Sequence, residues 1–124
     1  MKQKVSDYIA EYIAQWGIRD VFTVTGGGAM HMNDAFGHHK MLHCTYQHHE
    51  QACAMAAEAY ARLGNKMAAV CVTTGPGATN AITGVLGAWM DSIPMLVFSG
   101  QARYATTVSA SGLPLRSMGV QECN

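Results

Sequence analysis

The chain has 124 residues, of which 49% are hydrophobic and 13% are charged, a length that suits a single domain with one core. Eight Lys and Arg residues balance eight Asp and Glu residues, and the lack of any basic cluster argues against a nucleic-acid partner. Because soluble domains usually carry about 25% charged residues, we expect part of this surface to face other protein.

The first predicted element is an amphipathic helix over residues 5–16 that ends at Gly17. Its apolar side chains recur at spacings of three and four residues. They predict one buried stripe that contains Val5, Tyr8, Ile9, Tyr12, Ile13 and Trp16.

A unit of strand, turn and helix then occurs three times along the chain. The strands are predicted at 21–24, 42–47 and 67–73, the turns at 25–28, 48–50 and 74–77, and the helices at 29–36, 51–63 and 78–90. A fourth strand is predicted at 93–99, and no further helix or strand is predicted after Gly100.

Strands that alternate with helices and are apolar on both faces predict an α/β fold. We expect a doubly wound, mainly parallel sheet with helices on both faces. Because such a sheet is normally completed by another strand or two, we also expect the domain to be truncated, as the N-terminal piece of a longer protein.

Two further patterns concern location and redox state. The longest apolar stretches fall far short of the roughly 20 residues that span a bilayer, and the N-terminus lacks a signal-peptide core. The cysteines form no C-x-x-C pair, which is typical of reduced core residues. We therefore expect a cytoplasmic protein without a membrane segment. The cysteines are Cys44, Cys53, Cys71 and Cys123.

The turns at 26–28, 48–50 and 74–77 form the candidate site, because doubly wound sheets bind ligands at the carboxyl ends of their strands. Neither glycine turn matches a nucleotide fingerprint: both lack the third glycine of the dinucleotide motif and the Lys-Ser/Thr ending of a P-loop. Glycine still lets a ligand approach the backbone closely.

Glu50 has two interpretations. As a first-turn acid it would stabilise its helix through the helix dipole, by about 0.3–1 kcal/mol. As a catalytic acid or base it would be desolvated by Tyr46 and by the apolar helix face of Ala52, Met55 and Ala56.

Other chemistries are disfavoured. Five histidines lie close together in the sequence, but neighbouring histidines point in different directions and no H-E-x-x-H motif is present, so we interpret them as structural. No G-x-S-x-G motif supports a serine hydrolase. The five histidines are His38, His39, His43, His48 and His49.

Four segments occur in one order along the chain: HEQA to AEAYAR at 49–62, TTGPGATN at 73–80, DSIP at 91–94 and SGQ at 99–101. Together they resemble the thiamine diphosphate enzymes of the acetolactate synthase type. The likeness covers essentially the whole chain. It implies that residues 1–124 are the N-terminal pyrimidine-binding domain, without the central and diphosphate-binding domains.

The resemblance implies roles for individual residues. Glu50 matches the cofactor-activating glutamate, whose carboxyl group bonds a ring nitrogen of the aminopyrimidine and so promotes deprotonation of the thiazolium carbon. Gln121 and Gly28 would border the substrate pocket. The implied cofactor-binding residues are Gly26, Gly27, Glu50, Thr74, Gly75, Pro76 and Asn80.

The resemblance also implies what lies outside the chain. In that family Mg²⁺ holds the diphosphate on a separate domain with a Gly-Asp-Gly motif, and the site forms between two subunits of a dimer or tetramer. FAD is bound in some relatives, and this sequence leaves its presence open. The chain alone is therefore not expected to hold the cofactor tightly.

Two segments depart from the acetolactate synthase pattern. Residues 25–29 read TGGGA where those enzymes typically have Tyr-Pro-Gly-Gly-Ala, and residues 120–122 read VQE where they have Phe-Gln-Glu. The loss of a proline and an aromatic ring reshapes the pocket, so a different 2-oxo acid or an aldehyde acceptor stays open.

Two hypotheses result. The first is a thiamine diphosphate-dependent lyase or carboligase that decarboxylates a 2-oxo acid, with this chain as its pyrimidine-binding domain. The second is a non-catalytic α/β module for oligomerisation or regulation with the same fold. The presence of Glu50 in its turn favours the first.

Overall fold

A computed structural model describes residues 2–112. Its centre is a parallel sheet of four strands in the order β2-β1-β3-β4. The strands are β1 (Asp20–Thr23), β2 (His43–Tyr46), β3 (Ala68–Val72) and β4 (Met95–Ser99). The helical elements are α1 (Val5–Gln15), η1 (Gly27–Ala29), α2 (Met30–His38), α3 (Glu50–Gly64), α4 (Pro76–Met90), η2 (Tyr104–Thr106) and α5 (Val108–Ser111).

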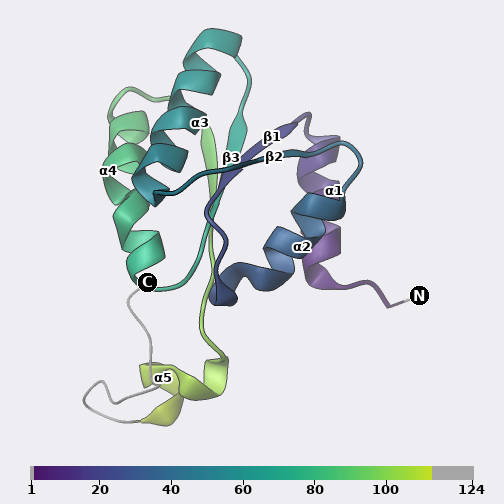
Figure 1. Ribbon diagram of the computed structural model, residues 1–124, viewed down its shortest axis with the longest axis vertical. Helices are drawn as coiled ribbons and strands as arrows, with labels where there is room; N and C mark the ends of the chain where they lie inside the picture. The colour runs from purple at the N-terminus through teal and green to yellow at the C-terminus, as the bar shows by residue number, and fades with distance from the viewer. Residues whose placement is uncertain (1, 113–124) are drawn as a thin grey trace.

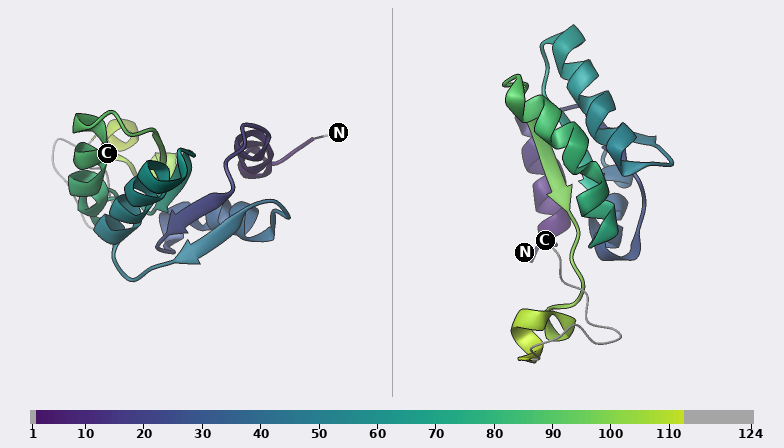
Figure 2. Two further views of the ribbon diagram at one scale, coloured as in Figure 1. Left: turned by 90° about the horizontal axis from the view of Figure 1, so that it is seen from above. Right: turned by 90° about the vertical axis from the view of Figure 1, so that its left-hand side faces the viewer.

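Helices cover both faces of this sheet (Figure 1). Helices α1 and α2 pack on one face through a cluster that includes Ile13, Val21 and Phe36, whereas α3 and α4 pack on the other through Cys53, Val70 and Ala81. The view from above separates the two helical layers (Figure 2). Every residue of the central strand β3 is buried. The predicted doubly wound α/β fold is therefore confirmed.

The predicted stripe on the first helix is confirmed only in part: Ile13 is buried and Ile9 packs against the same core cluster, whereas Val5 is exposed. Tyr8, Tyr12 and Trp16 are exposed along the outer side of α1, where the rings of Tyr8 and Tyr12 are stacked and those of Tyr12 and Trp16 are tilted. The buried side carries Ile13 together with small residues such as Ala10 and Ala14. Small side chains let a helix approach a sheet closely, and the bulky aromatic rings of α1 lie on the opposite side.

Helices α3 and α4 lie in close contact. A β-carbon added to Gly84 of α4 would lie 2.6 Å from the β-carbon of Ala54 on α3 and 3.0 Å from the backbone nitrogen of Met55. The absence of a side chain at Gly84 therefore sets the short distance between the two helices. This contact matters for the site because both helices begin at the carboxyl edge of the sheet.

The segment after Gly100 was expected to lack helices, and this expectation is wrong. Two short helical turns, η2 and α5, follow β4 and lie beyond the end of that strand (Figures 1 and 2). Thr107 between them is buried; its hydroxyl donates to the Tyr104 carbonyl at 2.8 Å and accepts the Ala110 N–H at 3.2 Å. Such a side-chain cap stabilises a short helix that composition alone reads as a loop.

Two cysteines lie in the cores as free thiols, as predicted. Burial is the larger cause that raises the pKa of Cys53 to about 11, and the charge of Glu50 adds to it. Burial raises the pKa of Cys71 to about 12. Both thiols are therefore protonated at neutral pH and are not nucleophiles. Cys123 lies outside the described residues.

Between residues 2 and 112, none of the helices has the length and apolar character needed to cross a membrane.

Candidate functional site

The turns that follow all four strands meet at one edge of the sheet, because parallel strands end on the same side. Gly26 to Gly28 follow β1, Glu50 follows β2, the segment 73–77 follows β3 and Gly100 follows β4. Contacts between these turns show that they lie together. The three turns of the candidate site therefore lie together, and a fourth turn joins them.

Thr73 connects the turns after β1 and β3. Its hydroxyl oxygen accepts the Gly28 N–H at 3.0 Å. A β-carbon at Gly26 would collide with the Thr73 side chain, and one at Gly77 would lie 2.7 Å from its methyl group. Thr73 was not predicted as a site residue. Its place directly after a buried strand is the signal that could have found it.

Gly75 makes the turn between β3 and α4. Its φ of +62° is a conformation that favours glycine. The Gly75 carbonyl accepts the N–H groups of Ala78 and Thr79 at 2.9 and 3.0 Å. Pro76 occupies the first helical position, where proline costs no hydrogen bond. The helix therefore begins at Pro76, two residues before the predicted start.

Glu50 is the first residue of α3 and is half-buried. Its Oε2 atom accepts a hydrogen bond of 2.7 Å from the Asn80 side-chain amide on α4. Its Oε1 atom faces Gly77, at which an added β-carbon would lie 3.5 Å away. Residues 50, 77 and 80, which are far apart in the sequence, thus form one corner of the site.

The apolar enclosure expected around Glu50 is not formed by the predicted neighbours. Tyr46 is 56% exposed and Met55 is 46% exposed. The Tyr46 hydroxyl lies near Gly37 of α2, on the other side of the sheet from α3. The prediction failed because alternate residues of a strand face opposite sides of a sheet, so closeness in sequence to Glu50 does not place Tyr46 beside it.

Gln101 is a second residue at this edge that was not predicted for the candidate site, although it lies in one of the recognised segments. Its Oε1 atom accepts hydrogen bonds of 2.8 Å from the Thr74 hydroxyl and from the Ala102 N–H. The first of these bonds ties the turn after β4 to the turn after β3. Gln101 is exposed at this edge and is available to a ligand.

Most of the predicted site residues come together at this edge, and one lies outside the described residues. Gly27 has no atom within 4 Å of the position that a β-carbon would take, so its backbone faces open space. Gln121 lies outside the described residues. The predicted residues at the edge are Gly26, Gly27, Gly28, Glu50, Thr74, Gly75, Pro76 and Asn80.

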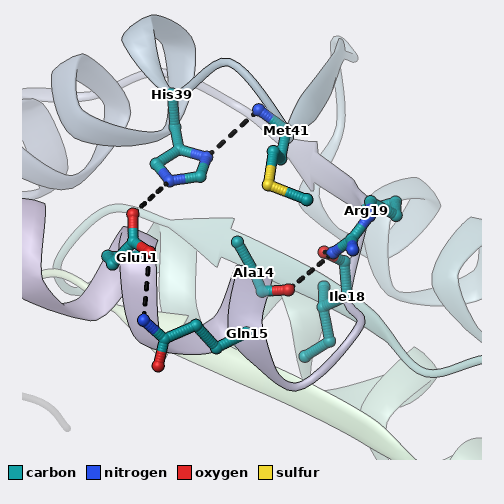
Figure 3. Close-up of polar contacts among 7 residues, drawn as sticks. All are labelled: Glu11, Ala14, Gln15, Ile18, Arg19, His39 and Met41. Carbon is teal, nitrogen blue, oxygen red and sulfur yellow. Dashed lines mark hydrogen bonds and ion pairs between the residues drawn. The ribbon is translucent and has the colours of Figure 1, made fainter.

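His39, which follows α2, makes ordinary structural contacts (Figure 3). His39 Nε2 lies 3.1 Å from Glu11 Oε2, and His39 Nδ1 accepts the Met41 N–H at 3.3 Å. The hydrogen bond from His39 is the largest cause that lowers the pKa of Glu11. Within residues 2–112, no three His, Cys, Asp or Glu side chains are grouped so that they could hold a metal ion.

An apolar groove of about 380 Å³ lies between α4 and β4. Its lining includes Val72, Leu86, Trp89 and Val97 and contains no titratable side chain. Glu50 does not line it, so this groove and the corner formed by residues 50, 77 and 80 are separate features. Leu86 and Trp89 are 50% and 75% exposed.

Comparison with known proteins gives one consistent result. The family described as "Thiamine pyrophosphate enzyme, N-terminal TPP binding domain" matches residues 3–121. The chain is 38% and 42% identical over 96 residues to the acetolactate synthase large subunits of Lactococcus lactis subsp. lactis and Buchnera aphidicola subsp. Schizaphis graminum. It is 37% identical over 99 residues to acetolactate synthase 2, chloroplastic, of Zea mays.

These three alignments cover 77%, 77% and 80% of this chain but 17%, 17% and 16% of the respective relatives. The chain therefore spans about one-sixth of the length of these curated relatives. The match over nearly the whole chain confirms the resemblance that the four sequence segments indicated. This chain belongs to the thiamine pyrophosphate enzyme family, as its N-terminal TPP-binding domain.

Proposed function

We propose that this chain is the pyrimidine-binding part of a thiamine diphosphate-dependent enzyme, similar to acetolactate synthase, that decarboxylates a 2-oxo acid and transfers the remaining fragment to an acceptor. The observation that carries the proposal is the position of Glu50. Its carboxylate lies at the carboxyl edge of a parallel sheet, with one oxygen held by Asn80 and the other facing a glycine.

The residues at this edge fit an aminopyrimidine ring. A carboxyl oxygen that faces a glycine can share a proton with a ring nitrogen, and the open space at Gly27 lets a planar group approach the backbone. When bound, thiamine diphosphate supplies an acidic thiazolium carbon and an electron sink. We propose Gly26, Gly27, Thr74, Gly75 and Pro76 as the residues around the ring, with Asn80 holding Glu50 beside it.

In this proposal Glu50 supplies the acid–base step. With the cofactor bound, it would hold the proton at the pyrimidine nitrogen and thereby favour the imino form of the neighbouring amino group, whose nitrogen can then accept a proton. Thr73 and Gln101 support it indirectly, because their hydrogen bonds keep the glycine turns and the start of α4 in place. Gly28 and Gln121 are proposed to border the substrate.

Other parts of the enzyme are proposed to lie outside this chain. They include a central domain and a domain that holds the diphosphate through Mg²⁺. Whether FAD is bound is a separate question, which the visible absorption spectrum of the purified protein tests. The exposed apolar side chains of α4 support assembly into a homo-oligomer, a dimer or a tetramer. A cytoplasmic location stays a prediction.

The experiment that tests this function needs no knowledge of the substrate. Deuterium exchange of the thiazolium proton is followed in the natural protein that contains this chain, with thiamine diphosphate and Mg²⁺. We expect exchange to be at least about a hundredfold slower in Glu50→Gln. Glu58→Gln is the matched control on the same helix, because Glu58 pairs with Arg62 away from the site. Its exchange should equal that of the parent.

The two hypotheses give different results in this experiment. Exchange that is no faster in the parent than in free cofactor would favour the non-catalytic α/β module. Fast exchange that persists in Glu50→Gln would contradict the role proposed for Glu50, but it would still support the use of thiamine diphosphate.

A further inference from the structure

Asn80 contacts the first turn of α3 although it belongs to α4. Its Nδ2 atom donates to Glu50 Oε2 at 2.7 Å and lies 3.4 Å from His49 Nε2. A side-chain amide has two N–H groups. One serves Glu50, and the second can serve His49 when the histidine carries its proton on Nδ1. The amide thus joins two consecutive residues at the start of the neighbouring helix.

The packing of the two helices sets this contact. Ala54 lies one turn after Glu50 on α3, and Gly84 lies one turn after Asn80 on α4, so both pairs occupy the same helix faces. The close approach of Gly84 to the Ala54 side chain therefore fixes the helix separation next to the hydrogen bond. This short separation lets asparagine, which has a short side chain, reach the carboxylate.

The two oxygens of Glu50 have different environments. Oε2 is engaged by Asn80, whereas Oε1 faces the bare α-carbon of Gly77. Since an ionised carboxylate accepts about four hydrogen bonds, Oε1 keeps its capacity to bind a ligand. A carboxylate with one oxygen held cannot rotate freely about its terminal bond, so the direction of the other oxygen is set.

We propose that Asn80 is a positioning residue that acts through Glu50 and does not contact the cofactor itself. This inference rests on the role proposed for Glu50 and replaces the direct cofactor contact that the family resemblance implied for Asn80. A positioning residue affects the reactivity of the bound cofactor, whereas a cofactor contact affects its affinity.

The test uses Asn80→Asp in the natural protein that contains this chain. Aspartate has the same shape as asparagine but cannot donate a hydrogen bond from an ionised oxygen. We expect exchange of the thiazolium proton to fall by about tenfold or more, while the dissociation constant for thiamine diphosphate changes by less than about threefold. Thr79→Ala is the matched control, because the Thr79 hydroxyl bonds the Pro76 carbonyl within its own turn.

Two further measurements separate positioning from a general structural effect. The loss caused by Asn80→Asp should vanish in a Glu50→Gln background, because the residue acts only through Glu50. A crystal structure of the variant without cofactor should show the Glu50 carboxylate turned away from its parent position. Asn80→Ala, which removes the amide without adding a charge, replaces Asn80→Asp if circular dichroism shows that the latter is unfolded.

The outcomes are distinguishable from those of the proposed function. Slow exchange in Glu50→Gln combined with parent-like exchange in both Asn80 variants would overturn the role of Asn80 alone. A loss of affinity for thiamine diphosphate as large as the loss of exchange would also overturn the role of Asn80. An additional loss of exchange when Asn80→Asp is combined with Glu50→Gln would overturn it as well. Parent-like exchange in Glu50→Gln would overturn both proposals together.

Discussion

Gly100 lies directly against the backbone of Gly28. A β-carbon at position 100 would lie 2.5 Å from the Gly28 carbonyl oxygen, 2.6 Å from its carbonyl carbon and 2.7 Å from the Ala29 nitrogen. All three are backbone atoms, which cannot rotate away as the end of a side chain can. The turn after β4 and the turn after β1 are therefore held together by the absence of a side chain at one position.

This contact predicts that Gly100→Ala destabilises the protein by about 1–3 kcal/mol, the usual cost of forcing an extra methyl group into a packed site. The free energy of unfolding in urea measures the effect. Gly27→Ala is the control, because its β-carbon would meet no atom within 4 Å. A cost below about 0.5 kcal/mol is expected there, and equal costs for the two variants would contradict the observed packing.

Thr73→Val should cost about 1 kcal/mol of stability, because valine keeps the volume of threonine but leaves the Gly28 N–H without the acceptor that it has at 3.0 Å. Thr73→Ser keeps the hydroxyl oxygen and should restore the hydrogen bond. Amide hydrogen exchange at Gly28 provides a local measurement. Protection at Gly28 that is the same in the valine and serine variants would show that the hydroxyl is not the acceptor.

Alkaline pH should destabilise the fold through Cys71. Burial raises the pKa of this thiol from an ordinary value of 9.0 to about 12, so the unfolded chain loses the proton at a lower pH than the folded chain does. Stability from this group is present below pH 9 and is lost as the pH rises toward about 12.

Unfolding in urea at about pH 8 and about pH 10 measures this dependence. Cys71→Ala should be less stable at both values, because it leaves a small cavity, but its stability should fall less between them. A parallel fall in parent and variant would assign the alkaline loss to other groups.

Glu50→Gln should fold normally, with a change in unfolding free energy of about 1 kcal/mol or less. The side chain is half-buried and glutamine keeps its shape, so the main loss is the favourable interaction of a charge with the start of α3, worth about 0.3–1 kcal/mol. Thermal unfolding monitored by circular dichroism checks this. A collapse of stability would favour a purely structural role for this carboxylate.

Leu86→Glu should weaken self-association of the natural protein that contains this chain. Leu86 is half exposed on α4 beside Trp89, in the apolar groove, and a charge there would be desolvated in any interface that covers it. Leu63→Glu is the control, because Leu63 is 90% exposed at the end of α3. Sedimentation velocity of both variants measures the assembly; equal behaviour would place the interface elsewhere.

The four strands and the helices α1 to α4 could be predicted from the sequence to within about two residues, because apolar periodicity and glycine turns are local signals. The buried side of α1 could be predicted only in part, through Ile13, since periodicity records which side chains are apolar and not how closely a helix can approach its neighbour. Tyr12 and Ala10 show the difference: the larger apolar side chain is exposed and the smaller is buried. The cap made by Thr107 was missed because threonine is common in loops as well.

The sequence by itself determined the α/β fold and the edge of the sheet at which the candidate site lies, because strands in a parallel sheet must end on one side. It also singled out Glu50 and the glycine turns. Only the tertiary structure decided which groups surround Glu50. The hydrogen bond to Asn80 and the glycine contact between the turns after β1 and β4 join residues that are distant in the chain, and such contacts arise from packing distances that no local pattern encodes.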